Sequence, residues 1–255
     1  MRKPSPNTNT LNALVLWGIL SPKQLSLLMG VSVSYCSKEL KKLVRLGLAQ
    51  DVGRTMLDPL DPLYGRYYLI RRSSKISRFT DAESGFRLRV GSRLGDDKIV
   101  KFSSGVTAAR HYLFSSLAAF WVVDFISKAD PENPAICFPE SYLRSKFGWH
   151  RGLGPSHKVA NPRLTMVPDA LIVYRRVEIR IEAEMTAKSR GAYHSIFSHL
   201  RPEDDTVIYV YPDQNKLIEI SPRLPRNYRL GEVVLGDERG LSNIFKQKIL
   251  SLFVR

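Results

Sequence analysis

The chain has 255 residues, 44% of them apolar and 25% charged, proportions that are ordinary for a folded protein with one large or two smaller domains. Its 39 Lys and Arg against 24 Asp and Glu give a net charge of +15, which favours a polyanionic partner. The two cysteines have no Cys or His at zinc-ligand spacing, so we expect neither disulfides nor structural zinc. No secretory signal opens the chain, and the longest apolar run, 117–126, is too short to span a bilayer. We therefore expect a cytoplasmic protein.

Residues 1–78 are predicted to form a winged helix-turn-helix domain. Apolar spacing predicts three helices and then two strands joined by a polar loop, at about 11–19, 22–29, 34–46, 48–52 and 64–70. Ser21 and Pro22 open the second helix, Gly30 ends it, and one of the following serines caps the third. This part holds 13 basic and 4 acidic residues, a net charge of +9, and is therefore the expected DNA anchor.

The third helix has an apolar face and a basic face. The polar and basic positions predicted to contact double-stranded DNA, with two arginines of the wing, are Ser34, Tyr35, Lys38, Lys41, Lys42, Arg45, Arg54 and Arg66. The alternative is a basic face that is merely solvated. We favour DNA binding because the stripe, the turn and the wing agree with one another.

Residues 79–255 are predicted to form a second domain, reached through a basic linker at 71–78. We expect short strands at 86–90 and 98–102, a long buried helix at 106–127, and a glycine-rich loop at 149–158. Later expected elements are a hairpin around residue 175, a helix, two strands and a last amphipathic helix, at 189–200, 207–211, 216–220 and 240–255. The predicted fold class is α+β, with a mixed sheet flanked by helices.

The expected hairpin carries the most informative residues. Asp169 follows Pro168 at the start of its first strand, and Glu182 and Glu184 share one face of its second strand because side chains on a strand alternate. Converging carboxylates repel one another unless a cation such as Mg²⁺ or Mn²⁺ lies between them, and these three are the predicted metal ligands. Lys188 is a candidate to orient water or neutralise a phosphate, and Glu140 is a candidate fourth carboxylate. The alternative is an edge hairpin with a solvated polar face.

The Pro-Asp element at 168–169, the Glu-x-Glu element at 182–184 and nearby Lys188 resemble the restriction-endonuclease-like nucleases, in a variant with Glu in place of the usual Lys. With the winged helix, His111 and the Glu-x-x-Leu-Arg element at 140–144, the layout is similar to plasmid replication-relaxation proteins and C-type mobilization relaxases (MobC). The resemblance covers residues 10–220. It implies a DNA-binding domain followed by a restriction-endonuclease-like domain that nicks DNA at a transfer origin, with other mobilization or coupling proteins as further partners.

Three functions follow from these patterns. The first is a metal-dependent endonuclease or relaxase, in which water or a protein nucleophile such as Tyr193 attacks the phosphodiester. We do not expect a relaxase whose metal is held by a His-hydrophobic-His element, because the five histidines contain no such pair. The second is a non-catalytic regulator of plasmid replication or transcription that keeps a nuclease-like fold. The third is a restriction-type or repair nuclease, which would cut both strands or act on damaged DNA.

Overall fold

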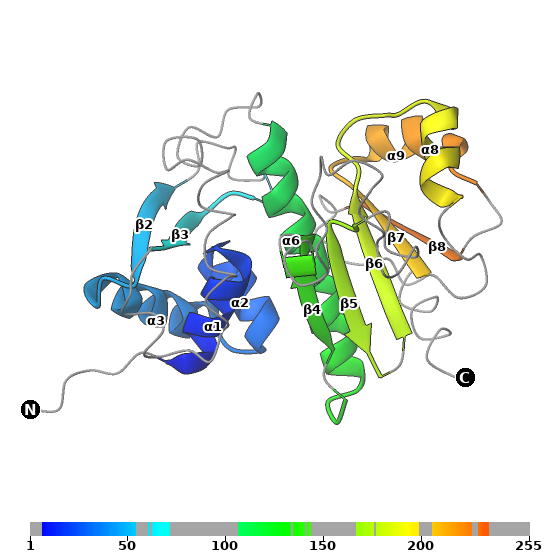
Figure 1. Cartoon of the computed structure of the whole chain (residues 1–255). Helices are drawn as coiled ribbons and strands as arrows, with labels where there is room; N and C mark the ends of the chain where they lie inside the picture. The colour runs from blue at the N-terminus through cyan, green and yellow to red at the C-terminus, as the bar shows by residue number, and fades with distance from the viewer. Residues whose placement is uncertain are drawn as a thin grey trace, which may run out of the picture. The chain divides into compact units, whose positions relative to one another are not determined.

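The structure is a computed structural model that describes residues 7–54, 61, 63–71, 107–133, 135–140, 142–143, 167–175, 177–198, 206–225 and 229–234. It is an α+β protein with two sheets (Figure 1). The contacts divide the chain into two compact units, Met1–Leu113 and Phe114–Arg255. The predicted boundary at residue 78 stays a prediction, because residues 72–106 lie outside the described residues. The expected strands at 86–90 and 98–102, the loop at 149–158 and the helix at 240–255 lie outside them too.

Unit 1 contains the predicted helices and strands in the predicted order. Its elements are α1 (Thr8–Trp17), β1 (Ile19–Leu20), α2 (Pro22–Met29), α3 (Val33–Arg45), β2 (Ala49–Arg54) and β3 (Arg66–Ile70). β3 lies between β1 and β2 and is antiparallel to both. The side chains of Leu11, Leu14, Leu25, Leu40 and Leu43 are fully buried, which confirms the predicted apolar faces of the three helices.

Local capping sets the bounds of the helices in unit 1. The side chain of Ser21 accepts a hydrogen bond from the backbone of Gln24, and the side chain of Gln24 accepts one from the backbone of Ser21, a reciprocal pair that satisfies two N–H groups at the start of α2. Gly30 ends α2 in the left-handed conformation that glycine adopts without strain. Ser32 caps α3 by accepting from the backbone of Tyr35. The second and third helices are therefore joined by a tight turn.

The long helix α6 spans Thr107–Ala129, close to the predicted 106–127. Its first described side chains belong to unit 1, where Arg110 donates to Asp61 at 3.0 Å. The stretch Arg110–Ala129 is long and apolar enough to cross a membrane by length and composition, with a mean hydropathy of 1.2, but 61% of it is buried inside the protein. A core helix of a water-soluble protein has the same character, so this helix is weak evidence for a membrane span.

Unit 2 is built on a five-stranded mixed sheet. Its strands, in the spatial order of the sheet, are β4 (Ile136–Pro139), β5 (Ala170–Tyr174), β6 (Val177–Ala183), β7 (Thr206–Tyr211) and β8 (Arg229–Val234). The first three are antiparallel, and β7 and β8 continue parallel to β6. β6 is therefore a central strand with a partner on each side. The edge hairpin considered from the sequence is not what forms.

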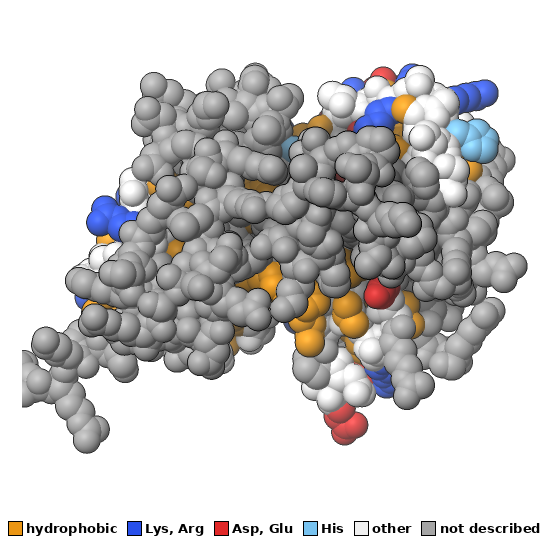
Figure 2. Space-filling model, in the orientation of Figure 1, with side chains coloured by type: hydrophobic (Ala, Val, Ile, Leu, Met, Phe, Trp, Pro, Cys, Tyr) orange, Lys and Arg blue, Asp and Glu red, His pale blue; other side chains and the backbone are white. Residues whose placement is uncertain are grey.

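The remaining helices of unit 2 are α8 (Arg190–Phe197), α9 (Gln214–Ile220) and a 3-10 turn, η3 (Ser221–Arg223). Lys and Arg side chains lie over α8 and α9 in the space-filling view (Figure 2). The predicted helix at 189–200 is confirmed, but the predicted strand at 216–220 is wrong, because this segment is α9. Asp213 caps α9 by accepting from the backbone of Lys216 at 2.9 Å, so the expected turn residue starts a helix instead.

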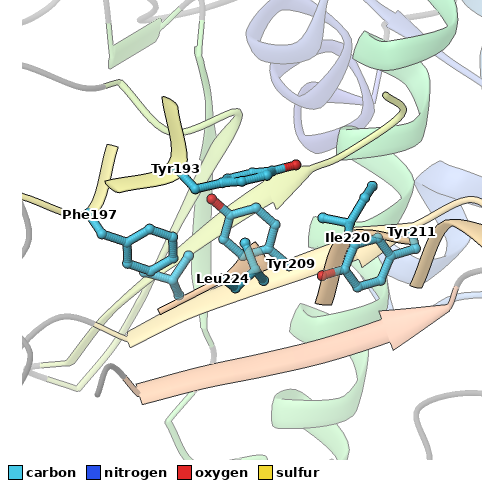
Figure 3. Packing of buried hydrophobic residues seen from close by; sticks show 7 residues of the cluster. Tyr193, Phe197, Tyr209, Tyr211, Ile220 and Leu224 are labelled. Atoms are coloured by element: carbon cyan, nitrogen blue, oxygen red, sulfur yellow. The ribbon is translucent and has the colours of Figure 1, made fainter. Parts of the chain in front are cut away.

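One face of β7 packs against α8 and α9. Its core consists of Tyr193, Phe197, Val207, Tyr209, Tyr211, Ile220 and Leu224 (Figure 3). The ring of Tyr209 is stacked on Phe197, with centroids 5.9 Å apart, and meets Tyr193 edge-on at 6.4 Å. Because Tyr209 pairs with Glu182 in the parallel register, Glu182 points to this same helix-covered face. The acidic residues of β6 therefore border an aromatic core.

Candidate functional site

The hairpin of β5 and β6 brings Asp169 next to Glu182. Tyr174 and Val177 close the hairpin around Arg175, which adopts a left-handed φ of 52°, as tight hairpin turns require. At the open end Ala170 pairs with Ile181, so the next position of the register sets Asp169 opposite Glu182. The carboxylate of Asp169 also accepts the backbone N–H of Ala183 at 2.8 Å. The two predicted acidic residues are therefore neighbours on one face.

The register extends this pair into a row across the sheet. The backbone N–H of Glu140, just past β4, donates to the carbonyl of Asp169 at 3.0 Å, which continues the pairing of Pro139 with Ala170. On the other side Glu182 pairs with Tyr209, and Tyr209 with Glu232. We call Glu140, Asp169, Glu182 and Glu232 the acidic row. Glu140 was predicted within a helical segment, and it is helical, but the strand β4 occupies the residues before it.

Glu182 is the most perturbed carboxyl group of the row. Burial raises its pKa well above the ordinary value of 4.5, and the neighbouring charge of Asp169 raises the pKa further. Lys188 and Arg180 act in the opposite direction. The side chain is half-buried rather than sealed in the core, and its charge is poorly compensated.

Glu184, a predicted metal ligand, is buried and forms an ion pair. It is 4% exposed, and its carboxylate accepts a short hydrogen bond from the ammonium of Lys188. The Lys188 side chain is 43% exposed, so the ammonium group that pairs with the buried Glu184 also reaches the protein surface. Arg223 donates to the carbonyl of Lys188 at 3.0 Å and fixes this segment from η3. The sequence predicted that Lys188 is near the acidic residues but not that it pairs with Glu184.

Tyr193 is unsuited to be the attacking nucleophile. Its side chain is fully buried in the core between α8 and β7, and its hydroxyl accepts the backbone N–H of Lys188 at 3.2 Å. Burial raises the pKa of Tyr193 to about 12, and the nearby charge of Glu184 also raises it, whereas the hydrogen bond from Lys188 lowers it. Tyr193 therefore supports the loop that carries Lys188.

Glu232, at the β8 end of the acidic row, is held by hydrogen bonds within the protein. Glu232 accepts hydrogen bonds from the hydroxyls of Tyr211 at 2.8 Å and Ser221 at 3.0 Å, so it holds η3 to the edge strand. Tyr209 is buried beside Glu182, and burial together with the charge of Glu182 raises its pKa. These groups were not predicted, because the strand β8 was not recognised and nothing local in the sequence links it to β7.

Among the described residues, no three Asp, Glu, His or Cys side chains are grouped closely enough to hold a metal ion. Glu184 is paired with Lys188, and the pair that remains is Asp169 and Glu182. Two carboxylates with the oxygens of a substrate phosphate suit Mg²⁺ or Mn²⁺, which keep waters and need few protein ligands. The three-ligand site of Asp169, Glu182 and Glu184 stays a prediction.

The predicted DNA-binding residues of α3 lie on its outer face. Ser34, Lys38, Lys41 and Arg45 are exposed, and we call them the α3 stripe. Tyr35 is 40% exposed, while Lys42 is half-buried and 4.0 Å from Glu39.

In the β2–β3 pair, where the wing was predicted, Arg54 and Arg66 are exposed and face one another. Arg54 donates to the Tyr64 hydroxyl at 3.2 Å, and Arg66 lies 3.5 Å from Asp51.

His111 is half-buried in the part of α6 that belongs to unit 1, whereas the acidic row belongs to unit 2. Two aromatic rings beside Glu140 were not predicted as part of the site: Phe138 and Tyr142 stack with centroids 5.0 Å apart, and both are half-buried. The sequence would predict that these rings lie near Glu140 only if 136–139 were first recognised as the strand β4.

Comparison with protein-family models, curated proteins and solved structures found no match to this chain.

Proposed function

We propose that this protein is a metal-dependent DNA-nicking enzyme, in which unit 1 binds duplex DNA as a winged helix and unit 2 cleaves one phosphodiester. The observation that carries the proposal is the acidic row, with Asp169 opposite Glu182 and the Glu184–Lys188 pair beside them. A perturbed carboxyl group next to a second carboxylate and an ammonium is typical of phosphodiester chemistry.

The arrangement of both units supports this proposal. In unit 1 a tight turn joins α2 to α3, and the two-stranded β2–β3 hairpin follows, as a winged helix requires. In unit 2 a mixed sheet flanked by helices carries acidic residues at the open end of an antiparallel hairpin, which agrees with the restriction-endonuclease-like arrangement that the sequence resembles. By the same resemblance, the biological role we propose is plasmid mobilization or replication relaxation at a transfer origin.

Each residue of the site has a distinct role in the proposal. Asp169 and Glu182 would hold Mg²⁺ or Mn²⁺, and the ion would supply Lewis-acid stabilisation of phosphate charge and an acidified water. The exposed ammonium of Lys188 binds a phosphate oxygen, and the ion pair with the buried Glu184 holds this ammonium in place. Glu140 lies beside Asp169 and extends the acidic surface.

Conversion of supercoiled plasmid to open circle tests the proposal. With Mg²⁺ or Mn²⁺ the wild-type protein should nick, and Asp169→Asn or Glu182→Gln should reduce the rate roughly 10²- to 10³-fold, as when a group that stabilises transition-state charge is lost. Glu178→Gln is the matched control, because Glu178 is exposed on the same strand away from the row. Nicking that is unchanged in both site variants would refute the assignment.

The second candidate is a non-catalytic DNA-binding regulator. The observation that favours it is the missing third ligand, since Glu184 is neutralised by Lys188 and no three-residue metal group exists among the described residues. This candidate predicts tight DNA binding without cleavage at any divalent metal. Binding and nicking measured on the same plasmid therefore separate the two functions, and linear product would indicate a double-strand nuclease.

A further inference from the structure

An exposed apolar cluster lies at the leading edge of α3. Among the described residues, the large apolar side chains classed as exposed are Val31, Val33, Tyr35, Ile136 and Ile218. Three of these five fall within five consecutive positions, at the turn before α3 and in its first turn, with exposed fractions of 36%, 49% and 40%. Such clustering in a small domain indicates a surface that is covered when a partner binds.

The leading edge is held in a fixed shape by the start of α1. Asn7 caps α1 through its side-chain oxygen and donates from its side-chain nitrogen to the Tyr35 hydroxyl at 2.9 Å. Next to this bond is an open hollow of about 600 Å³, lined by Asn7, Asn9, Met29, Val31, Ser32 and Tyr35. The Tyr35 ring therefore stands at a preformed concave surface whose rim is apolar and amide-rich.

The basic residues of α3 indicate which kind of partner covers this surface. The α3 stripe begins at Ser34, between Val33 and Tyr35, and continues through Lys38, Lys41 and Arg45, so the cluster is continuous with an exposed cationic surface. The acidic residue of this helix, Glu39, is half-buried near Lys42. An apolar protein groove has no need of this stripe, whereas a DNA duplex places phosphates along the helix and base edges at its first turn.

We propose that Val33 reads thymine through its C5-methyl group in the major groove, with Tyr35 on the opposite flank of the α3 stripe. This inference rests on the proposed DNA binding of unit 1 and adds the base that it selects. The methyl group is the apolar feature of the major groove, and it contacts apolar side chains, while the basic stripe positions the helix on phosphates without reading sequence. Val33 is the more exposed of the two and has no polar group that needs a partner.

Replacing thymine by uracil, which removes only the methyl group, tests the proposal. The probe is a short duplex selected by the wild-type full-length protein from a random-sequence pool and then resynthesised with deoxyuridine at one thymine at a time. At one or two positions the affinity should fall about threefold to fourfold, the worth of one buried methyl group. In Val33→Ala this difference between thymine and uracil should disappear at one of those positions.

The controls separate reading from folding. Ile218→Ala removes an apolar side chain of unit 2 that is even more exposed than Val33, and it should keep the full thymine preference. Thermal melting confirms that Val33→Ala is folded, and its affinity for the uracil duplex should equal that of the wild type. The inference is overturned if no position responds to uracil, if Val33→Ala keeps the preference, or if the pool yields no enriched sequence. Complete absence of DNA binding would instead refute the proposed function of unit 1.

Discussion

Glu182 is a carboxyl group whose charge is disfavoured in the folded protein. Its half-buried position and the charge of Asp169 across the hairpin both raise its pKa, and Lys188 offsets this only in part. A functional group that is unfavourable for stability is common at sites that bind a cation or a phosphate. The backbone pairing of β5 with β6 and the bond from the Ala183 N–H to Asp169 therefore hold this pair of acids together despite the repulsion of their charges.

We expect Glu182→Gln to stabilise the protein at pH 7 by roughly 0.5–2 kcal/mol, the range of single stabilising substitutions. An acid whose folded pKa is raised contributes fully to stability below its unfolded pKa, near 4.5, and loses this contribution as the pH rises through the folded pKa. The free energy of unfolding of the wild type should therefore fall with pH above 4.5, relative to the variant. Urea unfolding between acid and neutral pH measures this, with Glu178→Gln as control, and parallel pH profiles would contradict it.

Removal of the Tyr193 hydroxyl tests whether the protein itself attacks DNA. Because the side chain is fully buried, we expect Tyr193→Phe to keep nicking within a few-fold and to lose about 1 kcal/mol of stability from the bond with Lys188. Denaturing gels of stopped reactions should show no DNA covalently attached to protein. A covalent product in the wild type that is lost in this variant would show that Tyr193 is a nucleophile after all.

At the scale of single residues, the sequence predicted which acids share a face but not how deeply each is buried. Period-two alternation predicted that Glu182 and Glu184 share a face; the register sets Glu182 beside Tyr209, and Glu184 lies one residue past the end of β6. The burial of Glu184 and of Arg180 arises because this strand is central and helices cover the polar face. Alternation contains no information about which distant element covers a face, so the ion pair with Lys188 was not predictable.

The α3 stripe is the basic surface of unit 1 that the proposed DNA binding requires. We expect Lys41→Ala and Arg45→Ala each to lower DNA affinity evenly across sequences and to reduce the slope of log affinity against log salt by roughly 1, because each removes one phosphate contact. Lys23→Ala is the matched control, since Lys23 is an exposed lysine of α2 outside the stripe. Fluorescence anisotropy over a salt series measures these slopes, and equal slopes for all three variants would exclude α3 as the DNA-contacting helix.

Elements defined by local signals were predicted well, and those defined by distant partners were not. The start and end of α2 follow from Ser21 and Gly30, which act within their own turn. The segment 216–220 is rich in branched apolar residues and was expected to be a strand, but Leu217 and Ile220 recur at helical spacing after the Asp213 cap. Strand β8 forms by pairing with the free edge of β7, and the sequence of β8 itself does not indicate this pairing.

The two cysteines report on the two units of the molecule separately. Cys36 in unit 1 is fully buried and Cys137 in unit 2 is 3% exposed, and burial raises the pKa of both thiols. We expect neither to react with a thiol reagent in the native protein at pH 8, and both to react in urea. Duplex DNA should shift the urea midpoint of Cys36 labelling and Mg²⁺ that of Cys137. Labelling of the native protein, measured with single-cysteine variants, would contradict the burial.

At the scale of the molecule, the sequence predicted an α+β protein with a basic amino-terminal part and an acidic hairpin, and the structure agrees at that level. It did not predict the order of the five strands, because the parallel pairs of β6 with β7 and β7 with β8 join segments that are separated by helices.

The two-residue turn between β5 and β6 has a consequence for how the chain reaches its final state. A hairpin closed by so short a turn pays little loop-closure entropy and forms within roughly 1–10 μs, whereas β7 and β8 have to return through helical crossovers. Asp169 and Glu182 therefore meet early, while water still surrounds both carboxylates. We expect Tyr209 to pack beside the pair later, so that the electrostatic cost of placing Glu182 next to Asp169 and a buried ring arises late in folding.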